Sequence, residues 1–464
     1  MDLLEFAIKA AEKRGASQAE AYFNEINEFR VLYEKSQLKI GERKRDSGIG
    51  IRVALKHDSG FSTGFFYTNE LTGKAVGKAI KKALIVAKAR KADPDFESFQ
   101  EKKMLKNVGK IYDKRIQGLD PQRVIDIVKN QIEAALQQRK IETTSGLTMV
   151  GEYQTSITNS LGIDGGFQTT NFYSYSFALA KDGGSLGSGW DEYANCFYDE
   201  ERAVESSNSA AQLAVEQVHP KRMKGGRMRL VMPPSALMQL MINLIVQMLR
   251  ADKVQKHQSA LAGKIGHQVG SEVLTIVDDG RVPCAVGSKV FDDEGYPTRR
   301  TILIERGVLK SFLYNTYTAH KDGVKSTGNS HRVLILNPVP KYTLAPFVGP
   351  TNIVLKPGTS NKESLIGEVK NGLITKGFIG AHTANIASGD LSVALDCPFK
   401  IEDGEKSYPI KEAMISGNIF DLLKNVEAVG NDVKQFEFNL MGAMIKDSSL
   451  ISPSILVRDV SVST

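Results

Sequence analysis

Short glycine turns between strand-like segments constrain this chain more than any other feature. In its second half, runs such as EVLTIVDD, RTILIERG and LSVALDCPFKIEDG are rich in apolar and β-branched residues, which indicates strands. Breaks among these runs carry glycine behind a polar residue, at Asp279-Gly280, Glu294-Gly295, Arg306-Gly307, Asp322-Gly323 and Asp403-Gly404. Glycine accepts the positive φ that tight turns between antiparallel strands require. The pattern predicts a mainly antiparallel β region.

The first half has a different order of elements, and that order occurs twice. Leu3 to Lys13 and Asn69 to Ala92 have apolar residues at helical spacing, which predicts a helix at each end. Between them, alternation predicts two strands over residues 19–39 and a further pair over 48–55 and 60–67. A second helix, strand and helix series is expected over residues 121–138, 143–180 and 200–218.

These patterns predict an α+β protein of two domains. The N-terminal α+β domain is expected over residues 1–222, with an internal duplication of residues 1–95 and 113–219. The C-terminal domain, mainly antiparallel β with a few helices, is expected over residues 223–464. A chain of 464 residues with 41% hydrophobic residues is long enough to build both cores.

The charge of the chain does not indicate a nucleic-acid surface. The formal net charge is +7 and the pI is about 9.0, but the densest cluster, residues 42–46 (ERKRD), has acids at both ends. A solvated loop or strand edge explains it better than a phosphate-binding groove, because no nucleic-acid motif accompanies it. We therefore expect no direct contact with nucleic acid.

Other sequence features bear on location. The longest apolar run, Ala236 to Leu249, is interrupted by polar residues and is shorter than the roughly 20 residues of a membrane span. The three cysteines are scattered and form no disulfide framework. The opening MDLLEFAIKAAEKRG reads as an amphipathic helix rather than a signal peptide. We expect a cytoplasmic protein without a membrane partner.

A set of motifs follows one another in order along the chain. It comprises AGKIG, TIVDDG, FDDEGYPT, RGVLKSFL, KSTGN, SGDLS and IEDGE, preceded by the opening LLEFAIKAAEKRGASQAEAYF. This ordered set resembles the TldD/PmbA family of peptidase-like proteins, and more closely its TldE (PmbA) branch. The resemblance covers essentially the whole chain.

The resemblance implies a zinc site that this chain lacks. TldD-type members carry HExxxH on a helix and a cysteine ligand near the C-terminus. A gapless alignment on AGKIG places that hexapeptide over residues 242–247, where Ile242, Asn243 and Gln247 stand for the first histidine, the glutamate and the second histidine. Zinc needs imidazole, thiolate or carboxylate ligands, and its water needs a base. Because Cys397 lies before the family's cysteine region, we expect no metal, no cofactor and no catalytic residue.

Two further groups of residues have alternative readings. The acidic runs Asp278-Asp279 and Asp292-Asp293-Glu294 could hold a divalent ion, but turn and hydrogen-bonding roles are favoured. Residues 388–392 (SGDLS), near His382, are the closest approach to a nucleophile with a base. A family turn motif is favoured there, because no GxSxG or comparable context is present.

Polar residues recur every four positions on the predicted helix 235–249. Gln239, Asn243 and Gln247 would form one stripe on an otherwise apolar helix. A buried core helix is the favoured reading. The alternative is that the stripe lines what remains of the cleft in which TldD-type members hold metal.

The loop around the TGN motif is the remaining candidate for a peptide-binding site. In the family that this chain resembles, the loop lies close to the active-site groove. Its candidate residues are Ser326, Thr327, Gly328, Asn329, His331 and Arg332. Their hydroxyl, amide, imidazole and guanidinium groups could bind an extended peptide or brace a partner's loop. A tight turn held by its own Thr and Asn side chains is an equal alternative.

The resemblance therefore implies a TldE-like non-catalytic subunit that is inactive alone. A separate TldD-like zinc subunit would supply the chemistry for proteolysis of unfolded or modified peptides. Three alternatives stay open: a metal-free homodimer that binds peptides without cutting them, a regulatory protein of the kind labelled DNA gyrase modulator, and an independent hydrolase.

Overall fold

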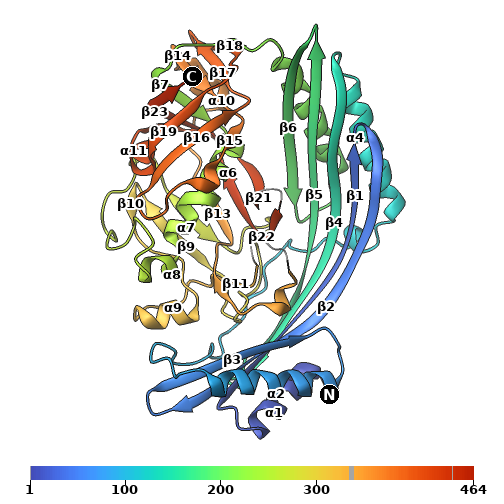
Figure 1. Cartoon of the computed structure of the whole chain (residues 1–464), viewed down its shortest axis with the longest axis vertical. Helices are drawn as coiled ribbons and strands as arrows, with labels where there is room; N and C mark the ends of the chain where they lie inside the picture. Colours follow the sequence, from blue (N-terminus) through green and yellow to red (C-terminus); the bar gives the residue numbers. More distant parts are fainter. Residues whose placement is uncertain (1, 334–338, 441–442) are drawn as a thin grey trace.

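The computed structural model describes residues 2–333, 339–440 and 443–464. Its chain forms an α+β fold of two domains, as predicted, in which one long curved sheet lies along the side of a compact β-rich domain (Figure 1). None of the helices in these ranges has both the length and the apolar composition needed to cross a bilayer.

The N-terminal half contains two series of helix, three strands and helix. The first is α1 (Leu3–Lys13), β1 (Gln18–Glu34), β2 (Gln37–His57), β3 (Gly60–Thr68) and α2 (Gly73–Ala89). The second is α4 (Pro121–Leu136), β4 (Ile141–Asn159), β5 (Asp164–Asp182), β6 (Ser185–Asn195) and α5 (Glu200–Glu216), preceded by the short α3 (Lys114–Gln117).

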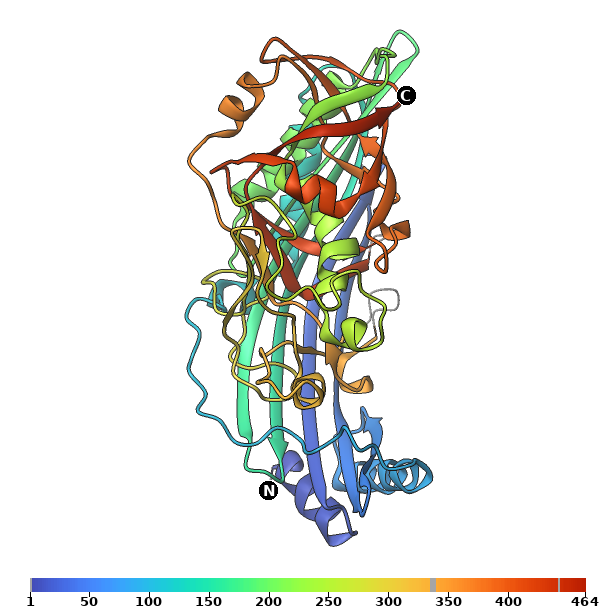
Figure 2. The same cartoon turned by 90° about the vertical axis from the view of Figure 1, so that its left-hand side faces the viewer.

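The six strands form one antiparallel sheet in the order β3-β2-β1-β4-β5-β6. The two series meet at β1 and β4, which pair from Glu20 with Asn159 to Tyr33 with Gly146. Figure 2 shows these strands running along the length of the molecule. Helices α1 and α2 pack at one end of the sheet and α4 and α5 at the other, so each series covers one end of the sheet with its own two helices.

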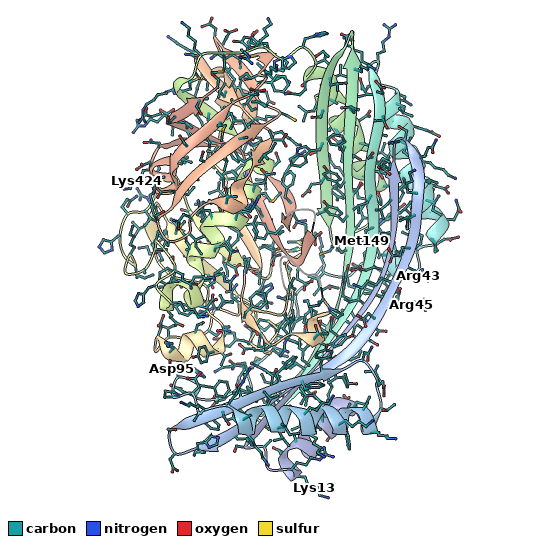
Figure 3. All side chains as sticks on the ribbon, in the orientation of Figure 1. Lys13, Arg43, Arg45, Asp95, Met149 and Lys424 are labelled. Carbon is teal, nitrogen blue, oxygen red and sulfur yellow. The ribbon has the colours of Figure 1, made fainter. Side chains whose placement is uncertain are left out.

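The charged residues 42–46 lie inside a strand. Where alternation predicted two strands and a break, β2 is continuous from Gln37 to His57, because β1 pairs with its whole length. Strand β3 pairs only with residues 49–57 of β2, so the charged part is an exposed strand edge, one of the two readings given above. Arg43 and Arg45 lie on the outer side of the sheet (Figure 3).

The C-terminal half is mainly antiparallel, as predicted, with short helices among its strands. Its helices are α6 (Pro234–Leu240), α7 (Val246–Leu249), α8 (Ala251–Gln255), α9 (Thr316–Lys321), α10 (Lys362–Gly367) and α11 (Ile419–Lys424). Its first strands are β7 (Gly226–Met232), β8 (Ile276–Asp279), β9 (Arg300–Glu305), β10 (Val308–Leu309), β11 (Ser330–His331), β12 (Phe347–Val348) and β13 (Asn352–Leu355). The later strands are β14 (Asn371–Ile374), β15 (Gly377–Ile379), β16 (Asp390–Asp396), β17 (Phe399–Glu402), β18 (Glu405–Pro409), β19 (Met414–Asn418), β20 (Val426–Val429), β21 (Lys434–Leu440), β22 (Ala443–Ser452) and β23 (Ile455–Ser463).

Two larger sheets enclose the core of this domain. One has the order β10-β9-β8-β13-β22-β21 and the other β15-β16-β19-β23-β7-β14-β17-β18, with β20 added beside β23. Only the pairs β13 with β22 and β7 with β14 are parallel among the paired strands of these sheets in the described ranges. The helical segment from Pro234 to Leu249 lies in the main hydrophobic cluster, where Leu240, Leu244 and Leu249 are buried.

A buried glutamate on strand β21 forms a hydrogen-bonded contact between the two domains. Glu437 is fully buried and accepts hydrogen bonds from the amide of Asn171 on β5 (3.2 and 3.4 Å). Burial, with a contribution from nearby Glu192, raises the pKa of Glu437 to about 8. Burial likewise raises the pKa of Glu192 to about 8. Both acids are thus more readily protonated in the folded chain than in the unfolded chain.

These shifts predict that stability falls as the pH rises. A carboxyl group whose pKa is raised by folding stabilises the folded chain fully at pH values below its pKa in the unfolded chain, near 4.5. That stabilisation is lost as the pH rises through about 8. Glu437→Gln keeps a neutral side chain, so it should raise the free energy of unfolding at pH 9 by about 1–2 kcal/mol and change it little at pH 5. Urea unfolding at both pH values measures this, with the exposed Glu412→Gln as control. An equal effect of Glu437→Gln at both pH values would contradict the assignment.

Candidate functional site

The helical segment that aligns with the metal helix of TldD-type members changes its winding in the middle. Helix α6 continues through a π-helical turn, Met241–Ile245, into α7. The N–H of Val246 donates to the carbonyl of Met241, five residues back. Such a turn brings residues five apart toward the same side of the helix. Ile242 and Gln247, which stand for the two histidines of HExxxH, have this spacing.

The stripe predicted on this helix is present. Between Pro234 and Leu249, Gln239, Asn243 and Gln247 are half-buried and all other residues are buried. Asn243 donates to the carbonyl of Gln239 (2.7 Å), and Gln239 accepts from the N–H of Phe378 on β15. The segment is therefore a core helix whose polar side is less deeply buried than the rest.

Gln247 faces a small pocket, here called the helix pocket, which is lined by Ile242, Gln247, Arg250, His331, Val333, Phe347, Val348, Gly349, Pro350 and Ser448. It brings together two sets of residues that the sequence singled out separately, the metal-helix positions and the TGN loop. Gln247 donates from Nε2 to the carbonyl of Ile242 (3.1 Å) and accepts at Oε1 from Arg250 (3.0 Å). Its amide is therefore held in place by the protein.

His331 is the residue of the TGN loop that reaches this pocket. It is buried, and its Nε2 lies 3.4 Å from Nζ of Lys289. Burial, reinforced by the positive charge of Lys289, holds the pKa of His331 well below its usual range. The imidazole is therefore neutral near pH 7, and Nε2 accepts a hydrogen bond from the lysine ammonium.

The other candidates of this loop are used inside the protein. Ser326 and Thr327 donate from their hydroxyls to the carbonyl of Tyr314 (3.2 and 3.1 Å), and the amide of Asn329 donates to Asp278 (2.8 Å). Gly328 has a φ of +76°, which favours glycine. All of these side chains are buried, and the loop is held by hydrogen bonds to Tyr314 and Asp278, which belong to other segments of the domain.

Arg332 is fully buried and joins the domains. Its guanidinium pairs with Glu20 of β1 (2.6 Å) and donates to the carbonyls of Asp293 (3.2 Å) and Leu344 (2.7 Å). Arg52 of β2 completes a four-residue network, because it pairs with Glu20 (2.5 Å) and with Glu294 (3.1 Å). The partners are up to 312 positions apart in the sequence, and no local pattern could have indicated them.

The acidic runs take structural roles, as favoured. Asp278 accepts from the N–H and hydroxyl of Thr351 (2.7 and 2.8 Å), and Asp292 accepts from the N–H groups of Glu294, Tyr296 and Ser330. Burial raises the pKa of Asp278 to about 6 and, together with the charge of Glu294, that of Asp292 to about 8. These carboxyls brace turns within the domain.

The side chains at the metal-helix positions do not fit zinc. Ile242 has no donor atom, and the amides of Asn243 and Gln247 are engaged as described. Cys397 lines a different pocket, beside Asp191 and Lys376. Ser388 donates to the carboxylate of Asp390 (2.6 Å) within a turn, the role favoured for the SGDLS motif.

Comparisons with known proteins agree with this fold. Residues 225–464 match the model of the PmbA/TldA metallopeptidase C-terminal domain, and residues 19–87 match that of the PmbA/TldA metallopeptidase domain 1. An uncharacterised protein of Methanocaldococcus jannaschii is 30% identical over 457 residues, which cover 98% of both chains.

Solved structures extend the likeness over the whole chain. A Thermotoga maritima protein, named for a suggested role as a modulator of a DNA gyrase, is 28% identical with a TM-score of 0.86 and covers 99% of both chains. TldE from Thermococcus kodakarensis, 23% identical with a TM-score of 0.89 over 100% of both chains, shares the fold. With a family model that matches more than half of its residues, this chain belongs to the PmbA/TldA metallopeptidase family, the TldD/PmbA family that its motifs resemble.

Proposed function

We propose that this chain is the TldE-like, non-catalytic subunit of a TldD/TldE-type metallopeptidase. Zinc, general base and water come from a TldD-like partner subunit. The observation that carries the proposal is the chemistry of the metal-helix positions, where Ile242, Asn243 and Gln247 offer neither zinc ligands nor a base. The π turn presents Ile242 and Gln247 to the helix pocket, and these are the two positions that align with the histidines of TldD-type members.

The proposed role of the chain is to hold substrate and complete the chamber of the assembly. Phe347 and Val348 supply apolar contacts and the neutral His331 a hydrogen-bonding edge, which suits an extended, unfolded or modified peptide. In the absence of its partner the chain is proposed to pair with a second copy of itself and to bind peptides without cutting them.

The test is cleavage of an unfolded peptide by this chain, by the TldD-like chain of the same source, and by their mixture. Cleavage by the mixture at least about tenfold above the sum of the separate chains is expected, because uniting the subunits assembles the whole site. If the TldD-like chain alone is as active as the mixture, this chain has no part in the reaction and the proposal fails.

The name of the Thermotoga relative favours a second candidate, regulation of a DNA gyrase. Direct DNA binding would show as an affinity that falls steeply with salt, since phosphate contacts release counterions. The exposed arginines of β2, Arg43 and Arg45, are the residues to replace in that assay. Salt-sensitive binding that these replacements remove would favour the regulatory role.

A further inference from the structure

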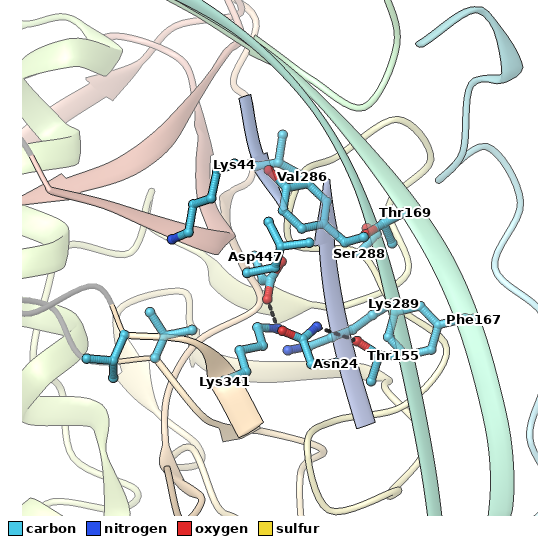
Figure 4. A pocket seen from close by; sticks show the side chains of 14 residues that line it. Asn24, Lys44, Thr155, Phe167, Thr169, Val286, Ser288, Lys289, Lys341 and Asp447 are labelled. Carbon is cyan, nitrogen blue, oxygen red and sulfur yellow. Dashed lines mark hydrogen bonds and ion pairs between the residues drawn. The ribbon is translucent and has the colours of Figure 1, made fainter. Parts of the chain in front are cut away.

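A second pocket, here called the lysine pocket, lies between the long strands of the N-terminal sheet and the C-terminal domain (Figure 4). Asn24 and Phe167 reach it from the sheet, and Lys289 and Lys341 reach it from the other side. It adjoins the helix pocket, because Val333 lines both and Lys289 touches His331. No sequence motif marked it.

Lys289 is a buried cation that no carboxylate of the described residues contacts directly, although its charge helps to lower the pKa of Asp293 from farther away. It is 2% exposed, and among the described residues its Nζ has one hydrogen-bond contact, to the neutral His331. Within those residues, no carboxylate oxygen lies within the 4.0 Å of an ion pair. A buried ammonium is costly unless it is paired, so an anion that entered the pocket would be bound strongly.

The nearby carboxylates are already engaged. Asp447 forms an ion pair with Lys341. Asp293 accepts from the hydroxyl of Tyr22 (3.0 Å) and from the N–H of Arg332 (2.8 Å), and lies 3.8 Å from Lys341. Burial and the positive charge of Lys289 lower the pKa of Lys341 to about 8, although the negative charge of Asp293 opposes this shift. Lys44 adds a further positive charge at the exposed side of the pocket.

Asn24 supplies an acceptor without a donor. It is 2% exposed and donates from Nδ2 to the carbonyl of Gln154 (3.2 Å), while its Oδ1 has no hydrogen-bond partner among the described residues. A buried oxygen left without a donor is costly. A ligand that offers an N–H at this point would remove that cost. Ile26, Phe167 and Val286 make the adjoining wall apolar.

An anion, an N–H donor and an apolar group occur together in the last residue of a peptide. We infer that the lysine pocket binds the C-terminal residue of a peptide, with its carboxylate on Lys289, its amide N–H on Oδ1 of Asn24, and an apolar side chain against Phe167 and Val286. Inorganic phosphate shares the charge but lacks the N–H and the apolar group. The inference rests on the proposed function only in taking peptides as the ligand class.

The test is binding of two matched peptides to the purified chain at pH 7 and low salt. Ala-Ala-Leu with a free C-terminal carboxylate is compared by calorimetry with the same peptide as its C-terminal amide. The free acid should bind roughly tenfold more tightly or better, because a charge-assisted contact in a buried site contributes at least that much. Lys289→Met should abolish the difference, and the exposed Lys310→Met should retain it.

The ligand pair decides the matter even if Lys289→Met fails to fold, since it needs only the unaltered chain. Equal binding of acid and amide, or no binding of either, would overturn the inference. Competition by inorganic phosphate as strong as by the free acid would show a general anion site and would overturn the peptide assignment. If the free acid binds more tightly than the amide but the mixed subunits do not cleave peptide, the subunit role alone is refuted. If the mixed subunits cleave peptide but acid and amide bind equally, this inference alone is refuted.

Discussion

Replacing Arg332 with alanine is expected to lower the free energy of unfolding by about 3 kcal/mol, the effect of removing one member of a buried charge network. Arg332 is fully buried and pairs with Glu20. Its removal leaves two backbone carbonyls without a donor, those of Asp293 and Leu344. It also removes a contact with the ring of Tyr22, 4.4 Å from the guanidinium carbon. Urea unfolding monitored by intrinsic fluorescence measures the loss.

The matched control is Arg306→Ala. Arg306 lies 3.5 Å from Glu272, and both side chains are about three-quarters exposed. Exposed pairs contribute about 0–1 kcal/mol, so this variant should unfold nearly as the unaltered chain does. If the two variants lose the same free energy, the network does not hold the domains together.

Replacing Gly64 with alanine is expected to cost about 2–3 kcal/mol, because the added methyl group has no room. Gly64 lies on β3 under α2, where a Cβ would come 1.9 Å from the carbonyl oxygen of Ala83 and 2.6 Å from the nitrogen of Ala87. Both are backbone atoms, so the helix itself would have to move. The melting temperature and urea unfolding together give the size of the effect.

The control for this substitution is Gly41→Ala on β2, where the nearest atom to an added Cβ is a ring carbon of Phe29 at 3.6 Å. This variant should be neutral or slightly stabilising, since alanine has less backbone freedom in the unfolded chain. Gly187 and Gly189 of β6 lie equally close to α5, with Cβ distances of 2.3 Å to carbonyls of Ala214 and Ala210. An effect at Gly64 no larger than at Gly41 would mean that α2 adjusts freely.

The fold could be predicted from local patterns because its elements have local causes. The helices over 3–13, 121–138 and 200–218 agree with the structure to within a few residues, since apolar spacing and end residues define them. Two of the glycine turns correspond to connections between paired strands, Arg306-Gly307 between β9 and β10 and Asp403-Gly404 between β17 and β18. Asp322-Gly323 instead follows helix α9. The break expected within β2 was wrong, because charged residues on an exposed edge do not end a strand that its neighbour pairs throughout.

The candidate site could be predicted only in part, for a physical reason. The motif alignment identifies Ile242 and Gln247 as the positions of the two histidines. The π turn that brings both residues to one pocket cannot be predicted from apolar spacing, because it does not change the helical pattern of the sequence. The burial of Asn329 and Arg332 depends on Asp278, Glu20 and other partners far along the chain. The lysine pocket forms where the two domains contact each other. Asn24 and Lys289 lie far apart in the sequence, and no sequence pattern links them.

The most direct test of the account is zinc content and peptide cleavage measured on the same preparation of this chain alone. The chain alone should hold zinc far below one atom per chain and should show no cleavage, because Ile242, Asn243 and Gln247 provide neither ligands nor a base. Stoichiometric zinc together with cleavage that a chelator abolishes would contradict it, and would require ligands elsewhere in the chain.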